Sequence, residues 1–234
     1  MKYIFFGKVH PERAALTLPE TKGEVGQKDG DFKGTIKVLV ILSQITVELD
    51  TTSKYHIIDL KNSVENFVHA MVDTYGYLKG YAYSVEILSV FIPETGHDEV
   101  FGIDVVQITE DEKNRPLNYN DALQLALKIP ELYMVLKDLR DAIKRPYDTF
   151  FHCRRATETI AKYFTAARNE DTDWSIAIDK LKLDDEELKS IGRAGSGQRH
   201  GNYKSVTGSE RVEIMMKTWR VVDSFIRYLA SKNN

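Results

Sequence analysis

The sequence predicts an α+β protein in which a mixed α/β module, residues 1–115, precedes an all-helical bundle, residues 118–232. In the first half, β-branched residues gather in short runs bordered by turn residues, whereas after Pro116 the apolar residues recur at helical spacing. Charge divides the chain in the same way: residues 1–117 contain 12 Lys and Arg against 18 Asp and Glu, and residues 118–234 contain 20 against 17. An anion-binding surface is therefore expected in the second module.

Composition places the chain among ordinary globular proteins, with 42% hydrophobic and 29% charged residues. Cys153 is the single cysteine, so no disulfide forms within one chain, and a reducing, cytoplasmic location is expected. The first apolar run ends at Gly7, which is too short for a signal peptide. The longest apolar block, residues 38–42, is far below the length of a membrane span, so we expect no membrane partner.

Three β-rich clusters and one amphipathic helix are predicted in the first module. β-Branched residues mark strands within residues 38–49, 81–92 and 100–108. Between the first two clusters, apolar residues recur at helical spacing over residues 60–78 and predict a helix of about five turns laid across a sheet. The glycines and alternating charges of residues 23–30 predict a loop.

A polar segment that ends in proline, residues 109–116, marks the domain boundary, and only helices are predicted after it. Asn118 or Asn120 suits a helix N-cap, and Pro130 suits the first turn of the next helix. Two later helices begin with capping-box patterns, Asp184-x-x-Glu187 and Thr207-x-x-Glu210. The predicted helices cover residues 118–128, 130–143, 146–164, 174–181, 185–191 and 207–229.

The segment between the last two predicted helices, residues 191–201, concentrates residues that suit phosphate chemistry. It contains Arg193, Arg199 and His200 among four glycines. Guanidinium groups bind phosphate oxygens through fixed N–H forks, and an imidazole takes and gives a proton near neutral pH. The plain interpretation is a helix C-terminus, with Gly195 as the stop signal, followed by a surface loop. The functional interpretation is that the two arginines hold a phosphate while His200 moves a proton.

A second charged cluster, Arg154, Arg155 and Glu158, lies on the helix predicted over residues 146–164. Glu158 follows the two arginines by four and three residues, so the simplest interpretation is an ion pair on the helix surface. The functional interpretation places the cluster opposite His200, where the carboxylate would orient the imidazole or raise its pKa.

No metal or cofactor site is predicted. His69, His97 and His152 lack the spacing of metal-binding motifs. No Gly-Lys-Ser/Thr follows the glycines of residues 191–201, so this segment is not a nucleotide P-loop. The Gly-x-Ser-x-Gly pattern of serine hydrolases is absent from the sequence.

The helical half resembles the HEPN superfamily over about residues 119–229. The likeness rests on a long helix with the charged cluster described above, then a short helix at Trp174, then an arginine and a histidine with six residues between them before the last helix. Arg193 and His200 form that pair. The resemblance implies a small helical bundle, often dimeric, that acts as a metal-independent endoribonuclease of toxin–antitoxin or antiviral defence systems.

In the mechanism that this resemblance implies, an RNA 2′-OH attacks the adjacent phosphorus and no metal or cofactor is required. We match the N-terminal module to no family and expect it to have a sensing or scaffolding role. The residues assigned to catalysis are His200, Arg193, Arg199 and Glu158, and those assigned to phosphate or RNA binding are Arg154, Arg155 and Lys204.

Two alternatives remain open. The chain departs from the HEPN signature because Ala194 stands where a polar residue is common, and because two glycines lie between Arg193 and His200. These departures favour a non-catalytic module that holds RNA, a nucleotide or an acidic protein surface through the same arginines. The other alternative is a purely structural dimerisation protein. A homodimer is the expected assembly, with the methionines and aromatic residues of the last helix as its face unless they pack within the chain.

Overall fold

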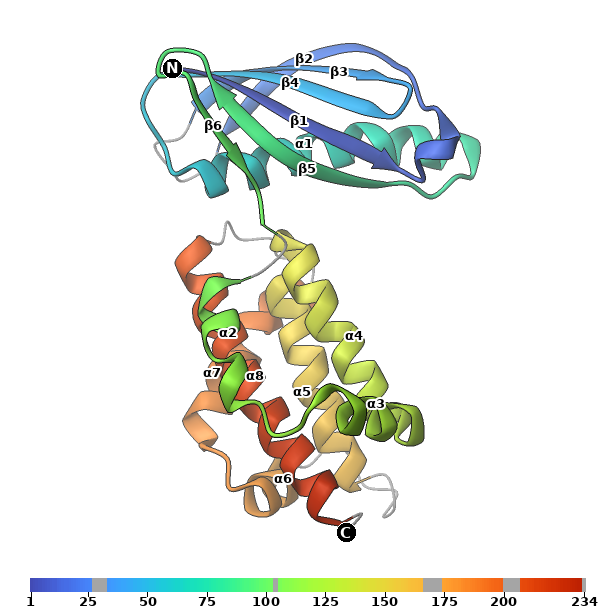
Figure 1. Ribbon diagram of the computed structural model, residues 1–234, viewed down its shortest axis with the longest axis vertical. Helices are drawn as coiled ribbons and strands as arrows, with labels where there is room; N and C mark the ends of the chain where they lie inside the picture. The colour runs from blue at the N-terminus through green and yellow to red at the C-terminus, as the bar shows by residue number, and fades with distance from the viewer. Residues whose placement is uncertain (27–32, 103–104, 166–173, 200–206, 233–234) are drawn as a thin grey trace. The chain divides into compact units, whose positions relative to one another are not determined.

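The computed structural model describes residues 1–26, 33–102, 105–165, 174–199 and 207–232 (Figure 1). The chain forms two compact units, Met1–Gly102 and Ile103–Asn234. The first unit is an antiparallel sheet with one long helix, and the second is built of helices, which confirms the α+β class. Within the described residues, no helix is both long enough and apolar enough to span a membrane.

A six-stranded antiparallel sheet in the order β2-β3-β4-β1-β5-β6 forms the first unit. Helix α1 (Ile57–Lys79) lies across one face of this sheet (Figure 1). Strand β1 is central and pairs with β4 and β5, whereas β2 and β6 form the two edges. The strands are β1 (Lys2–His10), β2 (Leu18–Gly26), β3 (Lys33–Ile41), β4 (Gln44–Thr51), β5 (Ser84–Ile92) and β6 (His97–Val100).

The core of the first unit lies between the sheet and α1. Side chains alternate between the two faces of each strand, so that Tyr3, Phe5 and Val9 of β1 are buried on the helix side. On α1, the facing residues recur every fourth position because such residues share one side of a helix. This buried stripe consists of Leu60, Val64, Val68 and Val72.

Both edge strands of the sheet carry charged residues on exposed positions. An unpaired strand edge is a template for pairing with another sheet, and charges along it disfavour such pairing. The edge residues concerned are Glu20, Lys22 and Glu24 on β2 and Asp98 on β6.

The sheet contains two strands that the sequence analysis did not identify, β1 and β2. The apolar run of β1 is short and interrupted by Gly7, and β2 is a mostly polar edge strand without apolar alternation. The loop predicted at residues 23–30 is wrong for residues 23–26, which complete β2. The strand predicted at residues 100–108 is also wrong, because β6 ends at Val100 and a helix begins at Val106.

Helix α5 occupies the centre of the second unit and packs against α4, α7 and α8. The long helices that sequence periodicity predicts are present, and the last of them spans most of the unit (Figure 1). The helices are α2 (Val106–Glu110), α3 (Tyr119–Lys128), α4 (Pro130–Lys144), α5 (Thr149–Thr165), α6 (Trp174–Leu181), α7 (Asp185–Arg199) and α8 (Gly208–Lys232).

The helix starts predicted at Asn118, Pro130 and Thr207 are confirmed, whereas the helix predicted from residue 146 begins at Thr149, after a 3-10 turn. The side chain of Asn118 accepts a hydrogen bond from the backbone N–H of Asp121 at 3.0 Å and caps α3. At the start of α8, the backbone N–H of Thr207 donates to Oε2 of Glu210 at 2.9 Å, and the backbone N–H of Glu210 donates to Oγ1 of Thr207 at 3.3 Å. This reciprocal pair is a capping box. Pro130 stands in the first turn of α4.

The methionines and aromatic residues of α8 pack within the chain. Met215 and Phe225 are buried in the core of the second unit, and Met216 and Trp219 pack against that core. The aromatic face proposed for a dimer is thus used inside the unit, and the homodimer stays a prediction.

Candidate nucleic-acid interface

Helix α7 runs through the segment that was expected to be a loop. Its glycines are helical, and Gly195 is buried where α7 crosses α5. A Cβ atom at position 195 would lie 2.6 Å from the Cβ atom of Arg154 and 2.7 Å from the carbonyl oxygen of Phe150. The loop prediction is therefore wrong over residues 192–199, because Gly195 serves a close contact between two helices rather than a turn.

This close contact brings Arg154 of α5 onto α7. The Nε atom of Arg154 donates to Oε1 of Glu158 at 2.7 Å, and its Nη1 atom donates to the backbone carbonyl of Gly192 at 3.1 Å. The ion pair between Arg154 and Glu158 confirms the simpler interpretation of their spacing. The guanidinium of Arg154 thus links two helices in addition to carrying charge.

The next residue, Arg155, faces another side of α5 and binds α4. Its Nε atom donates to Oδ1 of Asp138 at 2.7 Å, and its Nη2 atom donates to the same oxygen. The guanidinium also lies over the ring of Phe151, 5.3 Å from the ring centroid. The Arg155 side chain is 39% exposed, whereas that of Asp138 is 1% exposed. Arg155 is therefore a surface cation fixed from beneath by a buried carboxylate.

Asp138 is a site residue that sequence reasoning missed. It belongs to the buried stripe of α4 together with Leu132, Val135 and Ala142. A carboxylate inside an apolar helical stripe is the signal that identifies such a residue, because buried carboxylates require cationic or N–H partners. Its partners lie on another helix, 14 and 17 residues further along the chain, and no local spacing reveals them.

The Asp138 carboxylate stays ionised despite its burial. Burial alone would raise the pKa of this carboxyl, but hydrogen bonds from His152 and Arg155 more than offset it and hold the pKa below its ordinary value of 3.8. The Nδ1 atom of His152 lies 3.3 Å from Oδ1. Three donors thus converge on Oδ1, whereas Oδ2 is buried and has no hydrogen-bond partner among the described residues. The same contact raises the pKa of Arg155 above its ordinary value.

The remaining predicted site residues lie on α7 or beyond it. Arg193 is 70% exposed, and its Nη2 atom lies 3.6 Å from Oε2 of Glu186, two turns earlier in the same helix. Arg199 ends α7, but its side chain lies outside the described part of the chain, as do His200 and Lys204. The convergence of these residues on one phosphate stays a prediction.

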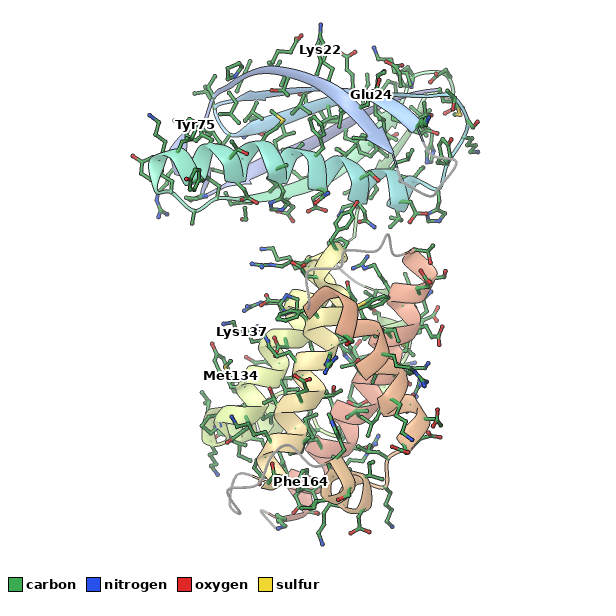
Figure 2. All side chains as sticks on the ribbon, turned by 180° about the vertical axis from the view of Figure 1, so that it is seen from behind. Lys22, Glu24, Tyr75, Met134, Lys137 and Phe164 are labelled. Carbon is green, nitrogen blue, oxygen red and sulfur yellow. The ribbon has the colours of Figure 1, made fainter. Side chains whose placement is uncertain are left out.

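The outer face of α4 adds a row of cations that the sequence analysis does not single out. Lys137, Arg140 and Lys144 are exposed and lie three and four residues apart. Residues at this spacing share one face of a helix, with a rise of roughly 4.5 to 6 Å between neighbours. Met134 continues the row, and Figure 2 shows Met134 and Lys137 on the outer side of α4. Arg155 contacts the same helix through Asp138, the residue that follows Lys137 in the chain.

The part of this unit that the structure describes presents no exposed histidine or cysteine. The His152 side chain is 6% exposed and engaged with Asp138. Burial raises the pKa of the Cys153 thiol to about 12, so this thiol stays protonated at neutral pH. Across the described ranges of the chain, no group of three or more His, Cys, Asp or Glu side chains is placed to hold a metal ion.

Sequence models of protein families match both halves of the chain. Residues 3–101 match "Domain of unknown function (DUF8168) N-terminal domain", and residues 120–230 match "Domain of unknown function (DUF8168) C-terminal domain". No curated protein and no solved structure matches the chain.

These matches correct the HEPN resemblance, which is wrong. The helical half is matched by a different family, and no HEPN model matches. The resemblance rested on the order of the helices and on the spacing between Arg193 and His200. Unrelated helical bundles can share both features. The N-terminal half, which the sequence features left unassigned, is matched by the N-terminal domain of the same family.

Proposed function

Because the chain belongs to the DUF8168 family, whose description gives no function, we propose from the geometry alone that its helical unit is a non-catalytic module that binds the phosphates of RNA. The observation that carries the proposal is the fixed guanidinium of Arg155. A guanidinium already held in one orientation loses little side-chain entropy when an anion binds, and its planar N–H groups match phosphate oxygens.

The cationic face of α4 supports the same proposal. Lys137, Arg140 and Lys144 extend the positive charge of Arg155 along a helix, which suits a linear polyanion better than a single phosphate. Tyr133 is exposed near the start of this row, where an aromatic ring can stack on an unpaired base. Such contacts favour single-stranded RNA over a duplex, because bases are free to stack only when they are unpaired.

The burial of His152 argues against RNA cleavage by this residue. Of the two histidines in the helical half of the sequence, His152 is buried against Asp138 and His200 lies outside the described residues. General acid–base catalysis requires a proton carrier within hydrogen-bond reach of the reacting atoms. His152 does not meet this requirement, whereas phosphate binding requires exposed cations alone.

Binding is tested by fluorescence anisotropy with a labelled single-stranded RNA over a series of salt concentrations. We expect the double variant Lys137→Ala/Lys144→Ala to bind about tenfold more weakly, with a salt slope smaller by roughly 1.4, because each lost phosphate contact on a single strand removes about 0.7. The matched control is Lys162→Ala/Lys180→Ala, which removes two exposed lysines from α5 and α6 and should leave the affinity unchanged. Equal losses in both double variants would contradict the proposal.

Cleavage is tested in parallel by incubating the same RNA with the wild-type chain in EDTA and separating the products on a gel. Intact RNA is expected. Products that end in a cyclic phosphate, absent with the His200→Ala variant, would show a metal-independent ribonuclease instead and would overturn the non-catalytic assignment.

A further inference from the structure

We propose that Asp138 is a positioning residue that aims the guanidinium of Arg155 at a phosphate group of bound RNA. This inference rests on the proposed function and deepens it by naming the groups that make one phosphate subsite. Asp138 touches no ligand in this proposal and acts through Arg155 alone.

The guanidinium of Arg155 is held on three sides by described residues. Asp138 Oδ1 accepts from both Nε and Nη2, Cζ lies over the ring of Phe151 at 5.3 Å from its centroid, and Nδ1 of His152 lies 3.4 Å from Nη2. Asp138 and His152 are themselves buried between α4 and α5, so they do not follow the motions of exposed side chains. The plane and direction of the guanidinium are therefore set by the core.

The hydrogen bonds of Arg155 to described residues use one edge of the guanidinium. They engage Nε and Nη2, and among the described residues Nη1 has no hydrogen-bond partner. The Arg155 side chain is 39% exposed, and we place the anion at its free edge. A phosphate oxygen on this edge would receive a charge-assisted hydrogen bond from a donor whose position is already fixed.

Asp138 provides a test in which charge and positioning predict opposite results. Simple charge counting predicts that removing this carboxylate strengthens the binding of a polyanion, because a negative charge next to the site disappears. Positioning predicts weaker binding, because the guanidinium is released and must be ordered again when the phosphate binds. The variant Asp138→Asn separates the two.

The variant Asp138→Asn also loses stability. It puts an amide group at a buried position where Oδ2 has no hydrogen-bond partner among the described residues, and an unpaired buried polar group is unfavourable. The milder variant Arg155→Lys avoids this difficulty, since it alters a partly exposed residue, keeps the charge and removes only the planar fork. Its matched control is Arg220→Lys, since Arg220 is an exposed arginine of α8, outside the cationic face of α4, whose Nε and Nη2 atoms both donate to Oε1 of Glu187.

The experiment measures RNA affinity by anisotropy for the wild-type chain and the three variants, at temperatures where circular dichroism shows each to be folded. We expect Arg155→Lys to bind about fivefold more weakly with an unchanged salt slope, and Arg220→Lys to stay within about twofold of the wild type. Asp138→Asn should also bind more weakly.

Two results would overturn the inference while leaving the proposed function in place. These are wild-type affinity in Arg155→Lys, or tighter binding in Asp138→Asn. Absence of RNA binding by the wild-type chain would overturn the proposed function and this inference together.

Discussion

Gly192 and Gly195 lie three residues apart on α7, but one has room for a side chain and the other does not. Among the described residues outside its own helical turn, no atom lies within 4 Å of a Cβ atom built at position 192, whereas a Cβ atom at position 195 would meet the backbone of α5 at 2.7 Å. We expect Gly195→Ala to lower the free energy of unfolding by about 1–3 kcal/mol through overpacking. Gly192→Ala should raise it by up to about 1 kcal/mol, since alanine is the better helix former.

Urea denaturation of the two variants checks this pair of expectations. Both variants add the same methyl group to the same helix, so the difference in sign isolates the contact with α5. The carbonyl of Gly192 that accepts from Arg154 is part of the backbone and is retained in Gly192→Ala. Equal effects at the two positions would show that α7 does not cross α5 at Gly195.

Cys153 should be inert until the helical unit unfolds. With a thiol pKa of about 12, roughly one molecule in ten thousand carries the reactive thiolate at pH 8. We expect iodoacetamide to leave the native protein unmodified, as read by mass spectrometry, and to label this residue fully in urea. Rapid labelling of the native protein would contradict the buried position of Cys153.

At the scale of elements, the contact between α4 and α5 should make stability depend on acid pH. The pKa of Asp138 is lower in the folded chain than in the unfolded chain, so the unfolded state binds more protons between the folded pKa and 3.8. The stability that this carboxylate contributes is therefore present above pH 3.8 and is lost as the pH falls through the folded pKa. We expect the stability difference between the wild type and Asp138→Asn to shrink below about pH 4.

Urea midpoints of the two proteins between pH 2.5 and 7 provide the measurement. The comparison uses the difference in stability between the two proteins because Asp223 titrates in both. Burial raises the pKa of Asp223, so its contribution to stability changes with pH in the opposite direction to that of Asp138. A stability difference that stays constant with pH would mean that folding does not change the pKa of Asp138.

The sequence predicts the elements of this protein where their signals are local. Helical periodicity identifies α1, α4, α5 and α8, and the caps at Asn118 and Thr207 follow from residue type and spacing alone. In the sequence, Gly195 predicts a helix stop, although in the structure it allows α7 to pass close to α5. The residue type alone does not distinguish a glycine at a close helix contact from a glycine that ends a helix.

The contacts of the candidate site also divide into those that local spacing predicts and those that it does not. The ion pair of Arg154 with Glu158 could be predicted because the two residues are one helical turn apart. The contact of Arg155 with Asp138 could not, because it depends on how α4 and α5 pack. The HEPN resemblance failed for a similar reason. It rested on the spacing of Arg193 and His200 along the chain, and a spacing does not determine how the helices around it pack.

At the scale of the whole molecule, each unit has a core made from its own residues, so we expect each to unfold as a cooperative unit. Both tryptophans of the chain, Trp174 and Trp219, belong to the helical unit. Val68→Ala should destabilise the sheet unit by about 2 kcal/mol by leaving a cavity against α1. The urea midpoint seen by tryptophan fluorescence should stay unchanged while the circular dichroism curve shifts. A parallel shift in fluorescence would indicate that the two units unfold together.

The charged borders of the sheet have a consequence for assembly. A protein that dimerises by extending its sheet needs an edge strand whose backbone is open to a neighbour, and β2 and β6 place charged side chains along that approach. Two copies aligned edge to edge would bring like charges together before any backbone hydrogen bond formed. If this chain forms a homodimer, we expect the contact to be made by other surfaces, and each copy should keep a separate sheet.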